Sequence, residues 1–117
     1  MDVVLARLGG RLWAVPTARV REVTQVGNIT PVPQAPAAIV GLMQLRGNIL
    51  PVIDLDGTGE RTLRPGDPLL VVEEGAVRAA LSVDQVVAVA TEPGGAELLD
   101  VGALFDRVRG HAPEALP

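Results

Sequence analysis

Two apolar runs joined by three residues most constrain how this chain can fold. They span residues 39–45 and 49–55, on either side of Arg46-Gly47-Asn48. Each run has the length of a strand, and a Gly-Asn pair between them suits a tight turn, so a β-hairpin is predicted. Neither run alternates cleanly between polar and apolar residues, which is typical of strands with little solvent on either face. The middle of the chain is therefore predicted to be a largely buried hairpin.

Arg46 is a lone cation at the tip of this predicted hairpin. An arginine held on a rigid turn presents a planar set of N–H donors that suits a carboxylate or backbone carbonyl groups. The alternative is a solvated turn residue, which is the usual role of a charged side chain on a turn. The pattern alone leaves both interpretations open.

The composition favours one domain with an aliphatic core. The 117 residues are 48% hydrophobic but only 2% aromatic, and 13 glycines and 10 prolines indicate many short strands and turns. A net charge of −4 argues against binding to nucleic acids or anionic membranes. The absence of cysteine excludes disulfides, thiolate nucleophiles and cysteine-ligated zinc. No long apolar run or basic N-terminal region is present, so a cytoplasmic protein without membrane insertion is expected.

The remaining segments are predicted from strand, turn and proline patterns. Residues 17–23 are expected to form a single helical turn, because Val20 and Val23 lie three residues apart. Residues 102–109 are expected to form a short amphipathic helix. The predicted strands are residues 3–8, 11–15, 68–73 and 76–82, with a valine-rich segment at 83–89, an extended segment at 96–101, a connector at 29–36 and a loop at 56–67.

The chain partly repeats itself, with residue 3 aligned to residue 69 and the same shift kept along the alignment. Strand, glycine turn, strand and a Val-x-x-Val pattern recur in one register, which predicts two related β-subdomains. The aligned pairs include Val3 and Leu69, Val4 and Leu70, Leu5 and Val71, Gly9 and Gly75, Val15 and Leu81, Val20 and Val86, and Val23 and Val89. Chance matching of two valine-rich segments is the alternative.

The two copies differ in length after the repeat. The segment from Val23 to Asp54 is much longer than the comparable segment from Val89 to Asp100. The second half therefore lacks about 20 residues, roughly one hairpin arm and its approach. A barrel that lacks a strand has open edges, which the C-terminal helix, a partner or a second copy of the chain would have to cover.

The central stretch closely resembles the signature of the CheW-like domain, the chemotaxis coupling-protein family. The matching segments are Gly41, Leu45-Arg46-Gly47, Pro51 and Asp54-Leu55, together with Ala14-Val15-Pro16, Val20-Arg21-Glu22-Val23, Pro33-Gln34-Ala35-Pro36, Val83-Asp84-Gln85-Val86 and Leu98-Leu99-Asp100. The resemblance implies an all-β fold of two SH3-like β-barrel subdomains related by a pseudo-twofold. The first would cover about residues 1–60 and a shortened second about 66–109, with a short C-terminal helix and a frayed tail at 110–117.

The resemblance also implies a function without catalysis. Members of the family bridge the cytoplasmic tips of chemoreceptors and the regulatory domain of the CheA histidine kinase, in two-component signal transduction. By position, Val20, Arg46 and Val89 match places used toward the receptor, and Glu22 and Gly41 match places implicated in coupling to receptor or kinase. Plain core packing is the alternative for the two valines, and close backbone approach is the alternative for Gly41.

Other chemistry finds little support in the sequence. His111, the only histidine, lies in the predicted tail, and Ser82, the only serine, has no base nearby in sequence. The segment from Asp54 to Glu60 only faintly resembles a calcium loop, because Pro65 occupies the position of the closing glutamate. No metal, cofactor or catalytic residue is predicted. The alternative to the adaptor is a self-associating or accessory scaffold, whose shortened subdomain pairs with another copy or a partner.

Overall fold

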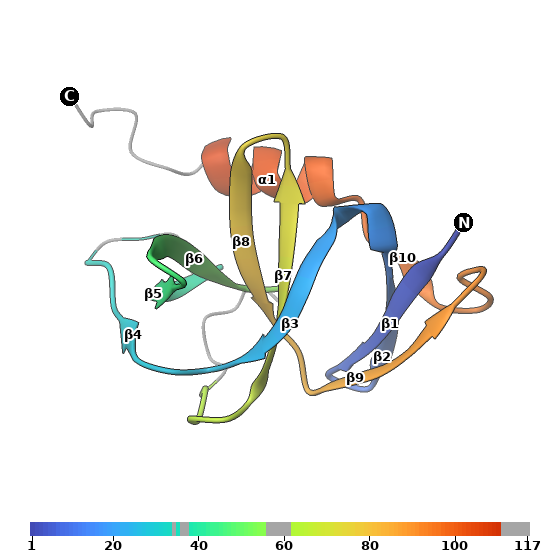
Figure 1. Ribbon diagram of the computed structural model, residues 1–117, viewed down its shortest axis with the longest axis horizontal. Coiled ribbons are helices and arrows are strands. Elements are labelled where there is room, and N and C mark those ends of the chain that lie inside the picture. Colours follow the sequence, from blue (N-terminus) through green and yellow to red (C-terminus); the bar gives the residue numbers. More distant parts are fainter. Residues whose placement is uncertain (34, 36–37, 56–61, 111–117) are drawn as a thin grey trace.

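Figure 1 shows the computed structural model of the protein, which describes residues 1–33, 35, 38–55 and 62–110. Within these residues the chain is mostly strand, with a short 3-10 helix and one α-helix at the C-terminal side, as predicted. The elements are β1 (Val3–Leu8), β2 (Arg11–Pro16), η1 (Thr17–Arg19), β3 (Val20–Gln25), β4 (Ile29–Thr30), β5 (Ile39–Leu45), β6 (Asn48–Asp54), β7 (Pro68–Glu74), β8 (Val77–Ser82), β9 (Gln85–Ala90), β10 (Glu97–Leu98) and α1 (Val101–Gly110).

The strands form two sheets that lie side by side, with α1 running across one end of them (Figure 1). Sheet A has the order β10-β2-β1-β9, and sheet B has the order β3-β7-β8-β6-β5-β4. Each sheet therefore combines strands from both halves of the chain. The sheets do not coincide with residues 1–60 and 66–109. In sheet A, β1 and β2 of the first half pair with β9 and β10 of the second, whereas in sheet B β3 and β6 of the first half pair with β7 and β8 of the second.

The pairing between the halves preserves the repeat in its register. Val3 lies opposite Pro16 in the first hairpin, and their repeat mates Leu69 and Ser82 lie opposite each other in the second. The pairings of β9 with β1 and of β3 with β7 obey the same shift, since Val89 lies opposite Val4 and Val23 lies opposite Leu70. Both of these pairings also contain a bulge at the equivalent place. Chance matching does not reproduce shared registers and shared bulges, so the predicted repeat is confirmed.

The central hairpin forms as β5 and β6, but its turn lies one residue earlier than predicted. Arg46 and Gly47 are the turn residues, with φ angles of 50° and 81°, and Asn48 is the first residue of β6. Two consecutive positive φ angles give a turn whose twist matches that of the strands. Arg46 is the one residue other than glycine with a positive φ among the described residues. The turn thus holds the Arg46 backbone in a conformation that side chains rarely adopt.

The helical turn predicted for residues 17–23 is wrong beyond Arg19. The 3-10 helix covers Thr17–Arg19, and β3 begins at Val20. Pairing between β3 and β7 decides the backbone here, and it overrides the three-residue spacing of the valines. Similarly, the predicted connector at 29–36 contains β4, which pairs with β5.

Two apolar clusters lie on opposite faces of sheet B, as alternation along its strands requires. The central core is shared by both sheets and α1; its buried members are Val4, Val15, Ile53, Leu70, Val72, Ala79, Leu81, Leu99, Val101, Leu104 and Phe105. The arm core lies beneath the segment β4–β6, which we call the arm; its buried members are Val26, Met43, Leu50, Val52, Leu69, Val71 and Ala80. The central core holds the two sheets together, whereas the arm core belongs to sheet B.

The second half is shortened where the sequence predicted it. In sheet B, β6, the last strand of the arm, pairs in parallel with β8 and antiparallel with β5. In sheet A, β10 pairs in parallel with β2 at the equivalent register but has only two residues. Within the described residues, sheet A has no strand beyond β10. Within the described residues, sheet A therefore has a short counterpart of β6 and no counterpart of β4 and β5.

The C-terminal helix begins after an acidic residue. The Ala103 N–H donates to Oδ1 of Asp100 over 2.9 Å, which satisfies one of the unpaired amides at the helix start. Val101, Leu104 and Phe105 are buried in the central core. The helix predicted at residues 102–109 is thus confirmed and is slightly longer, and the tail predicted to fray lies, from residue 111 on, outside the described residues.

Candidate interaction site

Two residues named from the sequence, Arg46 and Glu22, bind each other. Nε of Arg46 donates to Oε1 of Glu22 over 3.2 Å, and Nη2 of Arg46 donates to Oε2 over 3.1 Å. Arg46 comes from the turn between β5 and β6, and Glu22 from β3 at the edge of sheet B. The planar guanidinium therefore bridges two carboxylate oxygens, a geometry that fixes both side chains.

This contact changes the acidity of both groups. The hydrogen bond from Arg46 lowers the pKa of Glu22, and its positive charge, with those of Arg21 and Arg78, lowers it further. The same hydrogen bond raises the pKa of Arg46. The Arg46 side chain nevertheless remains 74% exposed, whereas Glu22 is 26% exposed. Arg46 is thus held in place by Glu22 while most of its surface faces solvent.

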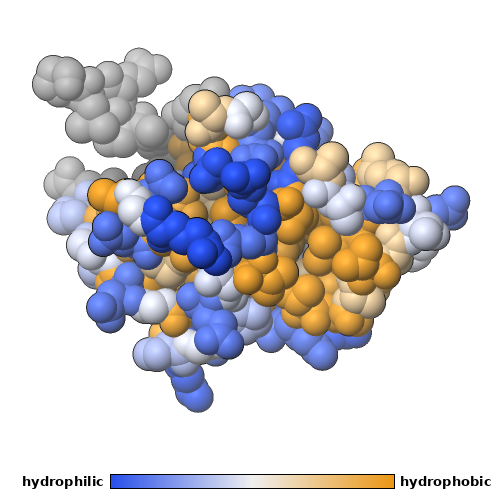
Figure 2. Space-filling model, in the orientation of Figure 1, coloured by the Kyte–Doolittle hydropathy of each residue, from blue (hydrophilic) through white to orange (hydrophobic). Residues whose placement is uncertain are grey.

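More charged side chains surround the pair on the rim of sheet B. Glu73 accepts a hydrogen bond from Nε of Arg78 at 3.3 Å and lies 3.9 Å from Nε of Arg21. Figure 2 shows strongly hydrophilic side chains gathered in the middle of this view. Exposed ion pairs of this kind add little stability, so their main effect is on the charge pattern presented to a partner.

Val20 and Val89 lie on different sheets. Val20, on β3 of sheet B, is half-buried and packs against the central core. Val89, on β9 of sheet A, is 71% exposed. Their repeat mates behave in the same way, since Val86 packs against the central core and Val23 is 51% exposed. Val20 thus packs against the core and Val89 does not, and a contact of either valine with a receptor stays a prediction.

Gly41 lies in β5 beside a bulge and is buried. A Cβ atom at this position would lie 2.6 Å from Cγ2 of Ile29 and 2.6 Å from the backbone oxygen of Thr30. No side chain fits at such distances, so glycine allows β4 to approach β5. Close backbone approach therefore explains this glycine, and its part in coupling stays a prediction.

Sequence reasoning named Glu22 and Arg46 separately and missed that they form one unit. The repeat contained a signal that Glu22 and Arg46 belong together. The repeat mate of Glu22 is Ala88, and the half that carries this alanine also lacks the arm that would bring an arginine to it. The glutamate is thus present only in the sheet that has the arm.

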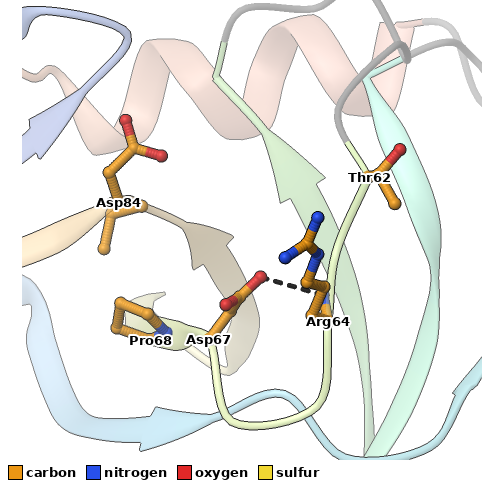
Figure 3. A pocket seen from close by; sticks show the side chains of 6 residues that line it. Thr62, Arg64, Asp67, Pro68 and Asp84 are labelled. Carbon is orange, nitrogen blue, oxygen red and sulfur yellow. Dashed lines mark hydrogen bonds between the residues drawn. The ribbon is translucent and has the colours of Figure 1, made fainter.

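Figure 3 shows a pocket elsewhere, lined by Thr62, Arg64, Asp67, Pro68, Val83 and Asp84. Its two carboxylates each bind a backbone amide. Oδ2 of Asp67 accepts from the Arg64 N–H, and Oδ2 of Asp84 accepts from the Gly9 N–H, each over 2.8 Å. These contacts shape two turns, which gives both aspartates a structural role.

Neither a membrane-spanning helix nor a metal-binding cluster occurs in the described part of the chain. No helix there is long and apolar enough to cross a membrane. Nor do His, Asp or Glu side chains cluster there in a group that could hold a metal ion. The weak calcium pattern between Asp54 and Glu60 falls mostly on residues outside the described ranges.

Comparison with known proteins gives a consistent result. Residues 2–93 match the family model of the CheW-like domain. Protein FrzA of Myxococcus xanthus is 36% identical over 84 residues, which are 69% of this chain and 52% of that protein. Chemotaxis protein CheW of Treponema pallidum is 35% identical over 72 residues, which are 59% of this chain and 42% of that protein. The chain thus spans about half the length of these relatives.

A solved structure supports the fold as well. The crystal structure of the scaffolding protein TtCheW from Thermoanaerobacter tengcongensis matches with a TM-score of 0.66 and 35% identity, over 76% of this chain and 60% of that one. The predicted fold class is therefore confirmed.

Proposed function

Because the chain belongs to the CheW-like domain family, we propose that it is a non-enzymatic adaptor that couples chemoreceptor tips to the regulatory domain of a CheA-type histidine kinase. The observation that carries the proposal is the family match over residues 2–93, which includes the whole of sheet B with its arm. The relatives are named as chemotaxis and scaffolding proteins, which favours an adaptor over an enzyme.

The contact with the receptor is proposed to centre on Arg46. Glu22 orients its guanidinium, and 74% of the side chain is left for a partner. An exposed, oriented arginine binds a carboxylate or the carbonyl groups at a helix end with little loss of side-chain entropy. Val89 is proposed to add exposed apolar contact on sheet A. Val20, Glu22 and Gly41 are proposed to act by supporting the shape of this surface.

Calorimetric titration with a receptor signalling domain tests the role of Arg46. Replacing Arg46 by alanine is expected to weaken binding about tenfold or more, because hydrogen bonds to charged groups contribute roughly 1.5–3 kcal/mol. Arg11→Ala is the matched control, since Arg11 is also an exposed arginine paired with a glutamate, Glu97, but lies on sheet A. Equal affinity of the Arg46 and Arg11 variants would remove Arg46 from the site.

A second variant separates direct contact from indirect support. In Glu22→Ala the guanidinium loses its internal partner but stays available, so the loss of affinity is expected to be smaller than in Arg46→Ala. The equivalent residue of sheet A is alanine already, so the substitution suits the strand. If both variants lose affinity equally, Arg46 acts only by holding the arm. Coupling itself is measured as kinase autophosphorylation with receptor, kinase and adaptor combined; an adaptor that leaves the rate unchanged contradicts the proposed function.

A further inference from the structure

Five charged side chains gather on the face of sheet B that carries the arm core. We call them the arginine cluster: Arg21, Glu22, Arg46, Glu73 and Arg78. Glu73 of β7 lies opposite Arg78 of β8, and Glu22 of β3 lies opposite Val71 of β7. Val71 is a member of the arm core, and alternate residues of a strand share one face. The cluster therefore lies on the arm face of the sheet, beside the tip of the hairpin.

The two carboxylates connect the members of the cluster. Glu22 accepts two hydrogen bonds from Arg46. Glu73 accepts one hydrogen bond from Arg78 and lies 3.9 Å from Nε of Arg21. The pKa of Glu22 is lowered first by the hydrogen bond from Arg46 and then by the positive charges of all three arginines. The five side chains thus form one electrostatic group.

The arginines form the outer layer of this group. Their side chains are 74% exposed at position 46, 52% at position 21 and 36% at position 78, whereas those of Glu22 and Glu73 are 26% and 28% exposed. A guanidinium has five N–H donors, of which Arg46 uses two and Arg78 one in these contacts. Three arginines against two glutamates leave a net positive charge here, although the chain as a whole carries −4. The solvent side of the cluster is therefore positive and keeps donors for a further acceptor.

The repeat shows that the fold itself does not need the cluster. The positions equivalent to 21, 22, 73 and 78 are occupied in sheet A by Val87, Ala88, Arg7 and Leu12. The strands of sheet A nevertheless pair in the same registers, with Arg7 opposite Leu12 as Glu73 is opposite Arg78. Exposed ion pairs also add little to stability. The charges of sheet B thus require another explanation than strand pairing.

Protection of a sheet edge explains only part of the cluster. Charged residues on an edge strand prevent pairing with other chains, and β3, which carries Arg21 and Glu22, is the edge strand of sheet B. Glu73 and Arg78 lie on β7 and β8, which are inner strands of the same sheet. These two residues protect no edge, so binding of a charged partner is the remaining role for the group.

We propose that the arginine cluster binds an acidic segment of a partner protein, with Arg21 and Arg78 each binding a carboxylate beside the one at Arg46. Guanidinium groups form paired hydrogen bonds with carboxylates, and several arginines in one group suit several carboxylates in succession. An acidic segment is repelled by most of this negatively charged chain and attracted to this face, which selects the place of binding. The phosphate backbone of a nucleic acid suits the face less well, because two glutamates lie among the arginines. The inference rests on charge and does not require that the partner be a receptor.

NMR signals of the arginine Nε–H groups test the proposal, with the whole chain titrated at low salt with end-capped hexaglutamate. The signals of Arg21, Arg46 and Arg78 are expected to shift. The signal of Arg11 is expected to stay in place, because Arg11 is 60% exposed and paired with Glu97 but lies on sheet A. End-capped hexaglutamine has the same length without the charges and is expected to shift none of them. Oligothymidine of equal charge is expected to bind more weakly than hexaglutamate.

A double variant measures the share of the two added arginines. Arg21→Gln combined with Arg78→Gln removes two charges and leaves Arg46 in contact with Glu22. The Kd for hexaglutamate is expected to rise about two- to fivefold for each arginine replaced, the range of exposed ion pairs. Arg11→Gln is the matched control and is expected to bind like the wild type. Circular dichroism establishes that the variants keep their strands; if the double variant does not, the signal shifts of the wild type decide.

Three results would overturn the proposal. The first is a shift of Arg11 as large as that of the cluster, or equal shifts with hexaglutamine. The second is a folded double variant that binds hexaglutamate as tightly as the wild type, and the third is tighter binding of oligothymidine, which would assign the cluster to nucleic acids. The titration contains neither receptor nor kinase, so its failure is distinct from a failure of the proposed adaptor function.

Discussion

At the scale of single residues, Arg46 stands in an uncommon backbone conformation and a defined ion pair. The hairpin turn holds its φ angle at 50°, and Glu22 holds its guanidinium at two points. A side chain on a flexible turn would lose more entropy on meeting a partner. The backbone and the carboxylate together therefore orient this arginine before any partner arrives.

The pair predicts a shift in the titration of Glu22. Arg46→Ala is expected to raise the pKa of Glu22 toward the ordinary glutamate value, because the hydrogen bond from Arg46 is the main cause of its lowering. Because the pKa of Glu22 is lowered in the folded protein, the pair stabilises the fold at pH values above the ordinary glutamate pKa. This stabilisation is lost as the pH falls through the lowered pKa. NMR titration of the side-chain carboxyl carbon measures the pKa of Glu22. An unchanged pKa in Arg46→Ala, or an equal rise in Arg11→Ala, would contradict this account.

At the scale of elements, α1 closes the central core from one end of both sheets. Its residues Leu104 and Phe105 are buried with Val4 of sheet A and Leu70 of sheet B. Ten residues are too few for an isolated helix to be stable, so packing must hold it. The helix is thus part of the core and not an appended tail.

Shortening Phe105 tests this role of the helix. Phe105→Ala is expected to lower the free energy of unfolding by about 3–5 kcal/mol, because the side chain is 4% exposed and leaves a cavity. Urea unfolding followed by circular dichroism measures the change. Asp106→Ala, the neighbouring exposed residue, is the control and is expected to change stability little. A Phe105 variant as stable as the control would mean that the helix does not pack as described.

At the scale of the whole molecule, the two sheets share one core, and each sheet contains strands from both halves of the chain. Neither sheet can be completed by one half of the chain, because sheet A combines β1 and β2 with β9 and β10, and sheet B combines β3–β6 with β7 and β8. The central core contains buried residues of both sheets and of α1. Unfolding one sheet would expose apolar surface of the other, which favours a single cooperative transition.

The single tryptophan reports on this cooperativity. Trp13 lies in β2 of sheet A, whereas Leu70 lies in β7 of sheet B. Leu70→Ala is expected to destabilise the protein by about 2–5 kcal/mol, and tryptophan fluorescence and circular dichroism should both shift to the same new urea midpoint. A fluorescence midpoint that stays in place while the circular dichroism midpoint moves would show that the sheets unfold separately.

Much of the local structure was predictable from local patterns. Alternation, glycine turns and strand-forming residues predicted the hairpins β1–β2, β5–β6 and β7–β8, and the repeat predicted the missing arm. The prediction of a helical turn at residues 17–23 was wrong because pairing of β3 with β7 outweighed the spacing of the valines. The site was predictable only as a set of separate residues. Its central contact joins residues 22 and 46, which no periodicity connects, and Val20 and Val89 proved to lie on different sheets.

The sequence by itself determined most of the strands and turns, the repeat and the absence of the second arm, because these follow from the order of neighbouring residues. Tertiary structure alone decided which strands share a sheet and that Arg46 meets Glu22. Pairing between distant strands depends on burying apolar faces against one another, and that burial is a property of the folded chain as a whole.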